Sequence, residues 1–394
     1  MNSKNWLYAL IPRLRLATMV CPLIVATTQA ADPNWGQPAG EHRIHPKAVF
    51  MEGLPLGPFA NLPNGDLVTV EDADNAKHAM VSSDDGKTWE KFPVFAEPDR
   101  FRISYERALT CTREGTVIVS FMNLVERAGW DWQADIHDSP DAKLPNYVVR
   151  STDGGRTWER PQKMHDDWTG AIRDMIQLRD GSVVFTSQMM LHQPGRHAVV
   201  TYASADQGAT WKRSNIIDLG GIGHHDGAIE ASFVQRRDES LWMLMRTNWG
   251  RLWQADSLDM GHTWRPIGPT SLDASAAPPI LERLASGRIL LAWNRYFWNG
   301  SEDFPAAGGD QQWSGTRTSN NRQELSIAFS DDDGASWSEP VVIATVNPTE
   351  DGKYPRKEIS YPYVFERRPG EIWLTAWRFG GFRVKLFEKD FVPN

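Results

Sequence analysis

Short apolar runs with the alternating pattern of β-strands recur along the whole chain, and no long stretch shows a helical period. Two examples are VIVSF at 117–121 and ILLAW at 289–293. The runs come in pairs that are separated by a short turn, usually with a glycine. Six such turns occur, at 64–65, 114–115, 180–181, 238–239, 286–287 and 369–370. The pattern predicts an all-β protein built from six similar units of about four strands each.

An eight-residue motif, Ser-x-Asp-x-Gly-x-Thr-Trp, accompanies five of the six strand pairs. Its copies begin at Ser82, Ser151, Ser204, Ser257 and Ser330, and only the last has serine in place of threonine. In such a turn the aspartate accepts backbone N–H groups, the glycine adopts a conformation that other residues avoid, and the tryptophan packs beneath neighbouring strands. The motif is therefore structural, and its repetition predicts a six-bladed β-propeller around a central channel.

The sixth unit lacks the motif. We expect it to borrow its outer strand from the N-terminal segment 44–50, which would close the ring and make residues 31–394 a single propeller domain. The motif is similar to the Asp-box of the sialidase (neuraminidase) superfamily, and the resemblance extends over about residues 45–390. This resemblance implies the six-bladed β-propeller with Asp-box repeats that the pattern also predicts.

Polar residues stand where the innermost strands are expected to begin. Counting nine residues back from each turn gives Leu56, Glu106, Ile172, Glu230, Pro278 and Tyr361. The innermost strands of a propeller surround its axis, and a strand start that touched only its neighbours would be apolar. Glu106, Glu230 and Tyr361 are therefore predicted to point into a polar site on the axis.

The resemblance implies roles for four residues. Sialidases use a tyrosine nucleophile that a glutamate activates, because their substrate carries a carboxylate at the anomeric carbon and would repel a carboxylate nucleophile. An arginine triad binds that carboxylate. On the family's motifs, Tyr361 corresponds to the nucleophile and Glu230 to the activating glutamate. Arg246 and Arg322 correspond to the second and third arginines.

The first blade departs from the family pattern. The segment GLPLGPF at 53–59 contains no arginine where sialidases carry the first member of the triad. We expect the clamp either to consist of two arginines or to be completed by Arg107, Arg173 or Arg378. The sugar is therefore expected to be acidic, either sialic acid or a relative of it.

The general acid and further substrate contacts are expected on the same rim. Sialidases carry the acid on a loop of the first blade, which is shortened here, so that Asp74 or Asp72 is the expected acid. Further candidates for contacts with the sugar lie close to the strand starts: Glu106, Arg107, Asp174, His225 and Asp226. Trp130 and Trp313 lie in long insertions of blades two and five, where they either stack on sugar faces or pack within the insertion.

The net charge of −8 argues against nucleic acid or an anionic membrane surface as a partner. Residues 1–30 begin with basic residues, continue into a short apolar stretch and end at a small-residue site. This pattern predicts a cleaved signal peptide, no membrane anchor and a secreted or periplasmic protein. Cys111 is the sole cysteine after residue 30, so no intrachain disulfide is expected. No ligand spacing suggests a metal, and the resemblance implies no cofactor.

Together these observations predict a retaining exo-glycosidase that releases a terminal acidic sugar from glycans or glycoconjugates. Two alternatives stay open. A glycosidase or polysaccharide lyase of another specificity would use His225 or Glu106 together with Tyr361, and the missing first arginine favours it. A carbohydrate-binding propeller without catalysis would have no need for the pair of Tyr361 and Glu230.

Overall fold

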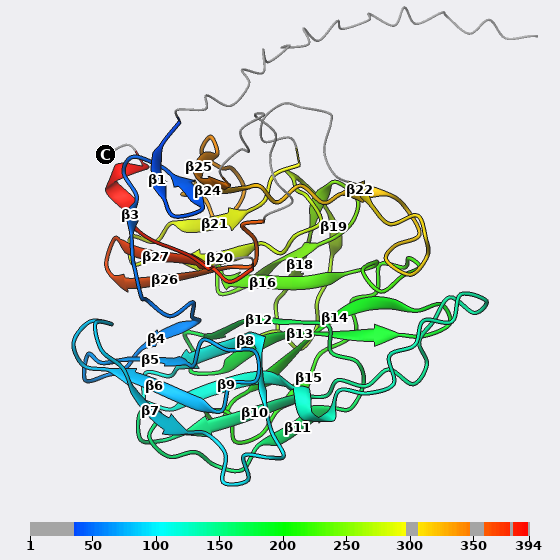
Figure 1. The fold of residues 1–394 in the computed structure, drawn as a ribbon, viewed down its shortest axis with the longest axis horizontal. Helices are drawn as coiled ribbons and strands as arrows, with labels where there is room; N and C mark the ends of the chain where they lie inside the picture. The colour runs from blue at the N-terminus through cyan, green and yellow to red at the C-terminus, as the bar shows by residue number, and fades with distance from the viewer. Residues whose placement is uncertain (1–34, 297–305, 347–357, 379–380, 393–394) are drawn as a thin grey trace, which may run out of the picture.

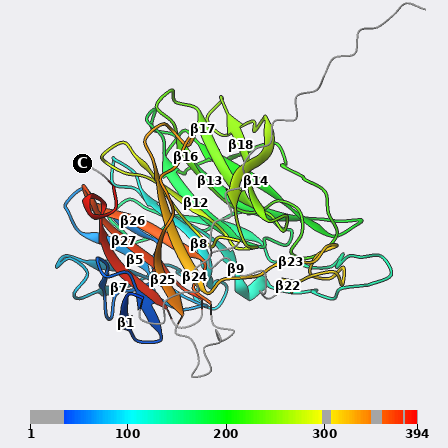
Figure 2. The ribbon, with the colours of Figure 1, turned by 90° about the horizontal axis from the view of Figure 1, so that it is seen from above.

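The computed structural model describes residues 35–296, 306–346, 358–378 and 381–392. Six antiparallel sheets form the blades of a β-propeller, which confirms the predicted fold (Figures 1 and 2). Within these ranges the helices are two 3₁₀ turns, η1 (Leu124–Glu126) and η2 (Glu388–Asp390). No helix there combines the length and apolar character needed to cross a membrane. The expected signal peptide at 1–30 lies outside the described residues.

Each blade contains four antiparallel strands, to which β1 and β2 are added in blade five, and the first strands of neighbouring blades contact one another around the ring. Blade one consists of β4–β7 (Phe59–Asn61, Leu67–Val70, His78–Ser82, Glu90–Pro93). Blade two consists of β8–β11 (Ile103–Cys111, Val117–Asn123, Asn146–Ser151, Gln162–His165). Blade three consists of β12–β15 (Ile172–Gln177, Val183–Leu191, Arg196–Ser204, Lys212–Arg213).

Blade four consists of β16–β19 (Ile229–Gln235, Leu241–Arg246, Arg251–Ser257, Ile267–Asp273). Blade five consists of β20, β21, β24 and β25 (Ile280–Arg283, Ile289–Trp293, Glu324–Ser330, Val341–Val346). A small hairpin, β22 (Ala306–Ala307) and β23 (Thr318–Ser319), lies in its insertion. Blade six consists of β26–β28 (Pro362–Arg368, Glu371–Ala376, Phe382–Phe387) and one strand from the N-terminal part of the chain, β3 (Val49–Phe50).

The N-terminal segment closes the ring, as predicted. In β3, Val49 pairs with Lys385 and Phe50 with Val384 of β28, so that the first and last parts of the propeller share one sheet. Figure 1 shows these blue and red strands side by side. The expected single strand at 44–50 is divided, because Ile44 ends β2 (His42–Ile44), which pairs with β25 in blade five. Together with β1 (Gln37–Ala39), β2 extends that blade by a hairpin that the sequence pattern did not predict.

The hydrophobic core lies between neighbouring blades. Phe121 of blade two packs in one cluster with Val68 and Val81 of blade one. Trp242 of blade four and Trp293 of blade five, each 1% exposed, share another cluster. Burial of such side chains contributes roughly 1.5–3 kcal/mol each, so the contacts between blades stabilise the ring as a unit.

The five motif copies form the expected turns at the ends of the third strands. In the third copy, Ser204 Oγ donates to Asp206 Oδ1 at 2.8 Å, and Gly208 N donates to Ser204 Oγ at 2.8 Å. Thr210 N donates to the same Asp206 oxygen at 2.8 Å. The Trp211 indole N–H then donates to the Gly208 carbonyl at 3.0 Å. The serine and aspartate of each copy thus form their hydrogen bonds within their own turn, which explains why the motif recurs without chemistry.

We predict that Gly261→Ala in the fourth turn destabilises the fold by about 1–3 kcal/mol. Gly261 has φ of +83°, and a Cβ there would lie 3.0 Å from Cγ1 of Val184. The matched control is Gly268→Ala in the same blade, where no atom lies within 4 Å of the added carbon. Its effect should stay within about 0.5 kcal/mol. Urea unfolding measures both values, and equal effects would contradict this role of the turn.

Candidate active site

Three of the predicted strand starts line one cavity of about 410 Å³ near the propeller axis. Glu106 lies in β8, Glu230 is the second residue of β16, and Tyr361 directly precedes β26. The sheet register shifts in β8 and in β16 at these positions, and such irregularities re-aim a side chain. Glu230 and Tyr361 also have positive φ, +45° and +63°. The backbone is therefore locally strained where these two side chains turn into the cavity.

Tyr361 and Glu230 are in direct contact at the floor of the cavity. The Tyr361 hydroxyl donates to Glu230 Oε1 at 2.9 Å. Arg246, at the end of β17, donates from Nη1 to Glu230 Oε2 at 2.6 Å, and the same Nη1 lies 3.5 Å from the Tyr361 oxygen. All three side chains are nearly inaccessible, with exposures of 3%, 5% and 0% for Tyr361, Glu230 and Arg246. A phenol, a carboxylate and a guanidinium thus form one buried hydrogen-bonded group.

The surroundings shift the pKa values of Glu230, Glu106 and Tyr361 in different directions. Burial alone would raise the pKa of Glu230, but the charge and hydrogen bond of Arg246 hold it below its usual value. Burial, reinforced by the charge of Glu230, raises the pKa of Glu106 to about 8. Burial and the charges of Glu230 and Glu106 raise the pKa of Tyr361 to about 12. At neutral pH the cavity therefore holds an ionised Glu230 beside an un-ionised Tyr361 and a protonated Glu106.

Three further arginines surround the ring of Tyr361. The Cζ atoms of Arg173, Arg322 and Arg378 lie 5.4, 5.6 and 5.4 Å from the ring centroid. Arg378 lines the cavity, whereas Arg173, Arg246 and Arg322, 2%, 0% and 4% exposed, lie next to Tyr361 without lining it. Arg322 Nη1 donates to Glu358 at 3.3 Å, while its Nε has no partner among the described residues. These cations offset part of the cost of keeping the Glu230 carboxylate buried.

Two of the three candidates for the missing arginine lie next to Tyr361, and one does not. Arg378 follows the end of β27, and Arg173 lies in β12 with its Nη2 donating to the Pro362 carbonyl at 2.6 Å. Arg107 does not line the cavity. It is fully buried and donates to backbone carbonyls of Gly57, Val70 and Glu71, so it holds the first-blade loop in place. This geometry gives Arg107 a structural role and does not favour contact with a substrate.

The structure separates the two candidate acids. Asp74 is exposed and lines the cavity, with its Oδ1 accepting the Tyr105 backbone N–H at 3.2 Å. Asp72 is turned away and forms an ion pair with Arg383 at 2.9 Å. Burial raises the pKa of Asp72 despite that pair. Asp74 is thus the carboxylate placed to reach a molecule in the cavity.

Two other expected contacts also lie outside the cavity. Asp174 accepts hydrogen bonds from Ser232 Oγ at 2.6 Å and Phe233 N at 2.9 Å. It lines a second cavity of about 400 Å³, and burial raises its pKa to about 6. Asp226, 3% exposed, accepts backbone N–H groups of Gly227 and Gly315 at 2.9 and 3.3 Å. It ties the turn that carries His225 to the insertion of blade five.

A wall of histidine and tryptophan rings closes one side of the cavity. His225 lines it and stacks on Trp313, with ring centroids 5.4 Å apart and an angle of 18°. The neighbouring His224 contacts Trp130 at 4.0 Å and approaches His197 at 3.2 Å between ring nitrogens. Burial lowers the pKa of all three histidines, to about 4 for His197. The insertions of blades two and five thus pack on the His224–His225 turn, and Figure 2 shows both on one side of the propeller.

Among the lining residues that sequence reasoning missed are His197, Gln188 and Trp377. Trp377 stacks on Tyr105 at 5.0 Å and 3° and lies 5.0 Å from the Tyr361 ring. The repeat could have indicated Trp377 and Arg378. They directly follow the second strand of blade six, and Arg246 stands at the end of the second strand of blade four. Gln188 and His197 gave no such signal. In the described ranges no group of three or more His, Cys, Asp or Glu side chains is arranged to hold a metal ion.

Two sequence comparisons relate this chain to known proteins. The sequence matches the BNR repeat-like domain over residues 114–374. A sialidase of Paraclostridium sordellii is 25% identical over 213 residues, which are 48% of this chain and 50% of that protein. The chain thus spans about half the length of that curated relative.

Solved structures share the fold. A protein of unknown function from Dyadobacter fermentans superposes with a TM-score of 0.57 at 16% identity, covering 89% of this chain and 100% of that chain. The NanB sialidase of Streptococcus pneumoniae gives 0.54 at 13% identity, covering 87% and 69%. These similarities concern the propeller and leave the chemistry to the residues of the cavity.

The raised pKa of Glu106 predicts a pH-dependent difference between wild type and Glu106→Gln. An unfolded glutamate ionises near 4.5, whereas folded Glu106 holds its proton up to about pH 8. The wild type should therefore lose stability relative to the variant as pH rises from about 4.5 to about 8, with a constant difference above that range. Thermal melting of both proteins from pH 4 to 9 measures this. A difference in melting temperature that does not change with pH would show that folding does not raise the pKa of Glu106.

Proposed function

This chain belongs to the family of BNR repeat-like domains, and from that premise we propose that it is a sialidase-like exo-glycosidase that releases a terminal acidic sugar from glycans. The observation that carries the proposal is the hydrogen bond of 2.9 Å between the Tyr361 hydroxyl and the Glu230 carboxylate inside the cavity. A binding protein has no need for a phenol beside a buried base. Tyr361 is proposed as the nucleophile and Glu230 as the base that activates it.

The charges in the cavity suit an anionic substrate. Tyr361, with a pKa of about 12, is uncharged when the substrate approaches, so it does not repel a carboxylate. Glu230 is ionised, because Arg246 holds its pKa below the usual value despite burial, and it can take the phenol proton. The positive charges of Arg173, Arg322 and Arg378 around the ring would stabilise the phenolate character that develops during attack.

The proposed reaction has two steps. In the first, the Tyr361 oxygen bonds to the anomeric carbon while the bond to the leaving oxygen breaks. Glu230 accepts the phenol proton, and Asp74 donates a proton to the leaving oxygen. In the second, Asp74 removes a proton from water, whose oxygen replaces Tyr361 on the anomeric carbon, and Glu230 returns the proton to the phenolate. The sugar is released with retained configuration.

Three arginines are proposed to bind the substrate carboxylate: Arg246, Arg322 and Arg378. Arg246 has Nε and Nη2 without a partner among the described residues, and Arg322 has an unpartnered Nε, so both retain donors for an anion. Arg378 of blade six lines the cavity together with Asp74 of blade one, whose first strand lacks the family's arginine. Arg378 is therefore proposed to replace that residue.

Residues 1–30 are proposed to direct export, because their basic start, apolar centre and small-residue end have the order of a signal peptide. The enzyme would then act on glycans outside the cytoplasm. The histidine and tryptophan wall beside the cavity is proposed to contact the part of the glycan that leaves, since flat rings suit sugar faces.

We predict that Tyr361→Phe and Glu230→Gln each lower turnover of a chromogenic α-glycoside of a nonulosonic acid by about 10²–10⁴-fold. Each variant removes one member of the nucleophile pair and changes little in volume. Tyr363→Phe is the matched control, because Tyr363 is two residues further along, in β26, and its hydroxyl donates to the backbone carbonyls of Tyr105 and Arg107. It should retain activity within a few-fold.

Initial rates and product analysis decide between the candidate functions. Equal turnover by wild type and Tyr361→Phe would refute the nucleophile assignment. An unsaturated product that absorbs in the ultraviolet would indicate a lyase. Binding without turnover in the wild type would indicate a carbohydrate-binding propeller.

If Arg378 belongs to the arginine clamp, the enzyme should bind a free carboxylate more tightly than its methyl ester. This preference should depend on Arg378. Arg378→Gln should weaken inhibition by the methyl glycoside of the acidic sugar about 10–100-fold, because a charge-assisted hydrogen bond contributes about 1.5–3 kcal/mol. Inhibition by the corresponding methyl ester should change little. Arg127→Gln is the control, since Arg127 also lines the cavity but lies over Trp168. The acid-to-ester ratio of inhibition constants should stay at the wild-type value in the control. An unchanged ratio in Arg378→Gln would remove Arg378 from the clamp.

A further inference from the structure

The tryptophan of the fifth Asp-box differs in its contacts from those of the first three. In the first three copies the indole N–H donates to the glycine carbonyl of its own turn, at 3.1, 3.0 and 3.0 Å. In the fourth copy Trp264 donates to Thr201 Oγ1 at 2.8 Å and is 1% exposed. In the fifth copy the indole N–H of Trp337 has no acceptor among the described residues, and the side chain is partly exposed. This tryptophan has left the position that its counterparts hold.

The cause lies in the preceding blade. The residue three positions after the inner turn contacts the glycine of the next Asp-box, and in blades one to three that residue is Val68, Ile118 or Val184. In blade six it is Trp373, whose nearest ring atom lies 3.3 Å from where a Cβ on Gly86 would stand, and Trp89 keeps the bond to its own turn. In blade four it is Trp242, whose ring atoms lie 2.7 and 2.8 Å from where a Cβ on Gly334 would stand. Trp242 therefore occupies the space beneath the turn, and Trp337 lies outside it, with the two ring centroids 6.2 Å apart.

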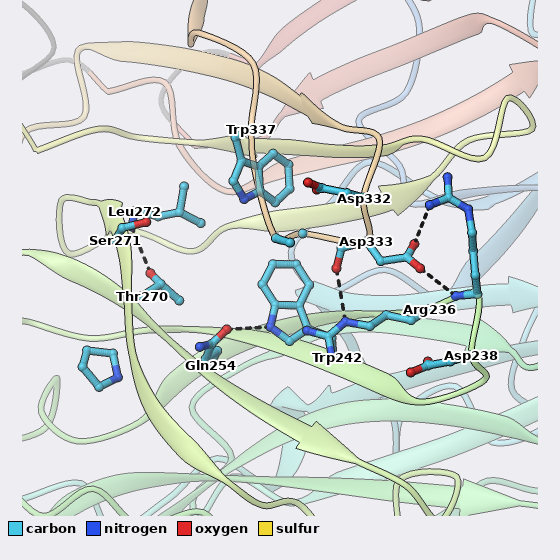
Figure 3. Close-up of a pocket in the computed structure, with 14 residues that line it drawn as sticks. Arg236, Asp238, Trp242, Gln254, Thr270, Ser271, Leu272, Asp332, Asp333 and Trp337 are labelled. Carbon is cyan, nitrogen blue, oxygen red and sulfur yellow. Dashed lines mark hydrogen bonds and ion pairs between the residues drawn. The ribbon is translucent and has the colours of Figure 1, made fainter.

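The displacement leaves an open pocket of about 650 Å³ between blades four and five. This volume lies within the range of about 300–1,000 Å³ that small-molecule sites occupy. Figure 3 shows Trp337 above Trp242, with Gln254 and Leu272 to one side and Asp333 and Arg236 to the other. The pocket thus combines an indole face with polar groups on both flanks.

Two hydrogen-bond donors of this pocket are unused. Gln254 Oε1 accepts the Trp242 indole N–H at 2.8 Å, which leaves the Gln254 amide N–H₂ without an acceptor in the described part of the chain. The Trp337 indole N–H is the second free donor. An indole face beside planar amide donors is suited to a pyranose ring, which offers an apolar face for stacking and hydroxyl oxygens as acceptors.

The charged groups around the pocket already have partners. Asp333 pairs with Arg283 at 2.6 Å and accepts the Arg237 backbone N–H at 3.0 Å. Arg236 pairs with Asp256 at 2.5 Å. A charged ligand would have to displace these contacts, so an uncharged ligand fits better. We infer that this pocket is a second carbohydrate site, which binds an uncharged pyranose unit by stacking on Trp337 and hydrogen bonding to Gln254.

This site is separate from the active-site cavity. Arg236 and Asp238 of the pocket belong to the turn after β16, whereas Glu230 lies at the start of that strand. The two ends of a seven-residue strand are about 20 Å apart. The two sites therefore face opposite sides of the propeller, and this one would hold another part of a glycan or a neighbouring chain while the cavity acts. Its occupancy does not depend on the proposed reaction.

Saturation-transfer NMR with the methyl glycosides of glucose, galactose, mannose and N-acetylglucosamine tests the site on the whole protein. At least one glycoside should receive saturation through the protons of its apolar face and should change the tryptophan fluorescence. Tyr361→Phe should bind it as wild type does. Trp337→Ala and Gln254→Ala should each weaken binding at least tenfold.

Trp242→Val provides an independent variant, because valine stands at this position in blades one and three. It should let Trp337 return beneath Gly334 and should abolish binding while the protein remains folded by circular dichroism. If Trp337→Ala does not fold, the effects of Gln254→Ala and Trp242→Val on glycoside binding test the site. Absence of saturation transfer from every glycoside, unchanged binding by Gln254→Ala, or loss of binding in Tyr361→Phe would overturn the inference.

Discussion

The buried contact of Glu230 with Arg246 and Tyr361 is the interaction on which the candidate site depends. Removing two charges from water costs several kcal/mol for each ion, and only good geometry and further hydrogen bonds offset that cost. Here the carboxylate accepts one bond from the guanidinium at 2.6 Å and one from the phenol at 2.9 Å. Arg246 thus keeps Glu230 ionised in surroundings that would otherwise protonate it. Loss of Arg246 would leave the Glu230 carboxylate as an unpaired buried charge.

The closure of the ring positions this contact. Glu230 belongs to blade four and Tyr361 to blade six, 131 residues apart, so nothing local brings them together. Blade six is completed by β3, and its place in the ring is fixed from both ends of the domain. The two residues also have positive φ, which costs about 1–3 kcal/mol each. The packing between blades, where side chains such as Trp242 and Trp293 are 1% exposed, supplies the stability that tolerates this strain.

The repeat made much of this structure predictable. The Asp-box is local, since its hydrogen bonds join residues two to four positions apart, so five copies were sufficient to predict a propeller. Counting back from the turns located Glu106, Glu230 and Tyr361, because in these three blades the chain crosses from the cavity to the turn in the same number of residues. Their immediate neighbours were harder to predict. Arg107 follows Glu106 in an extended strand, where successive side chains point to opposite faces, and it lies against the first-blade loop instead of the cavity.

Residues outside the repeat could not be placed from the sequence. His197 of β14 and Gln188 of β13 line the cavity from strands of nine residues each. The His224–His225 turn contacts the insertions of blades two and five, which have no counterpart in the other blades. Arg378 is intermediate, since its position after β27 matches that of Arg246 at the end of β17. Contacts made across blade boundaries depend on the ring geometry, and no local spacing in the sequence encodes them.

Positions at which one blade differs from the others carry the most information about this protein. A residue that recurs at the same position in all blades serves the scaffold, because each repeat must make the same contacts with its neighbours. The first blade lacks the expected arginine, and Arg378 of the neighbouring blade six lines the cavity instead. Blade four has Trp242 where blades one and three have valine, and its ring lies closer to the next Asp-box glycine than that of Trp373 in blade six; there the Asp-box opens into a pocket. In both cases a change in one blade alters the surface of the adjoining one, because each blade packs directly on the next. The seams between blades are therefore where a repeated scaffold acquires sites that its repeat does not contain.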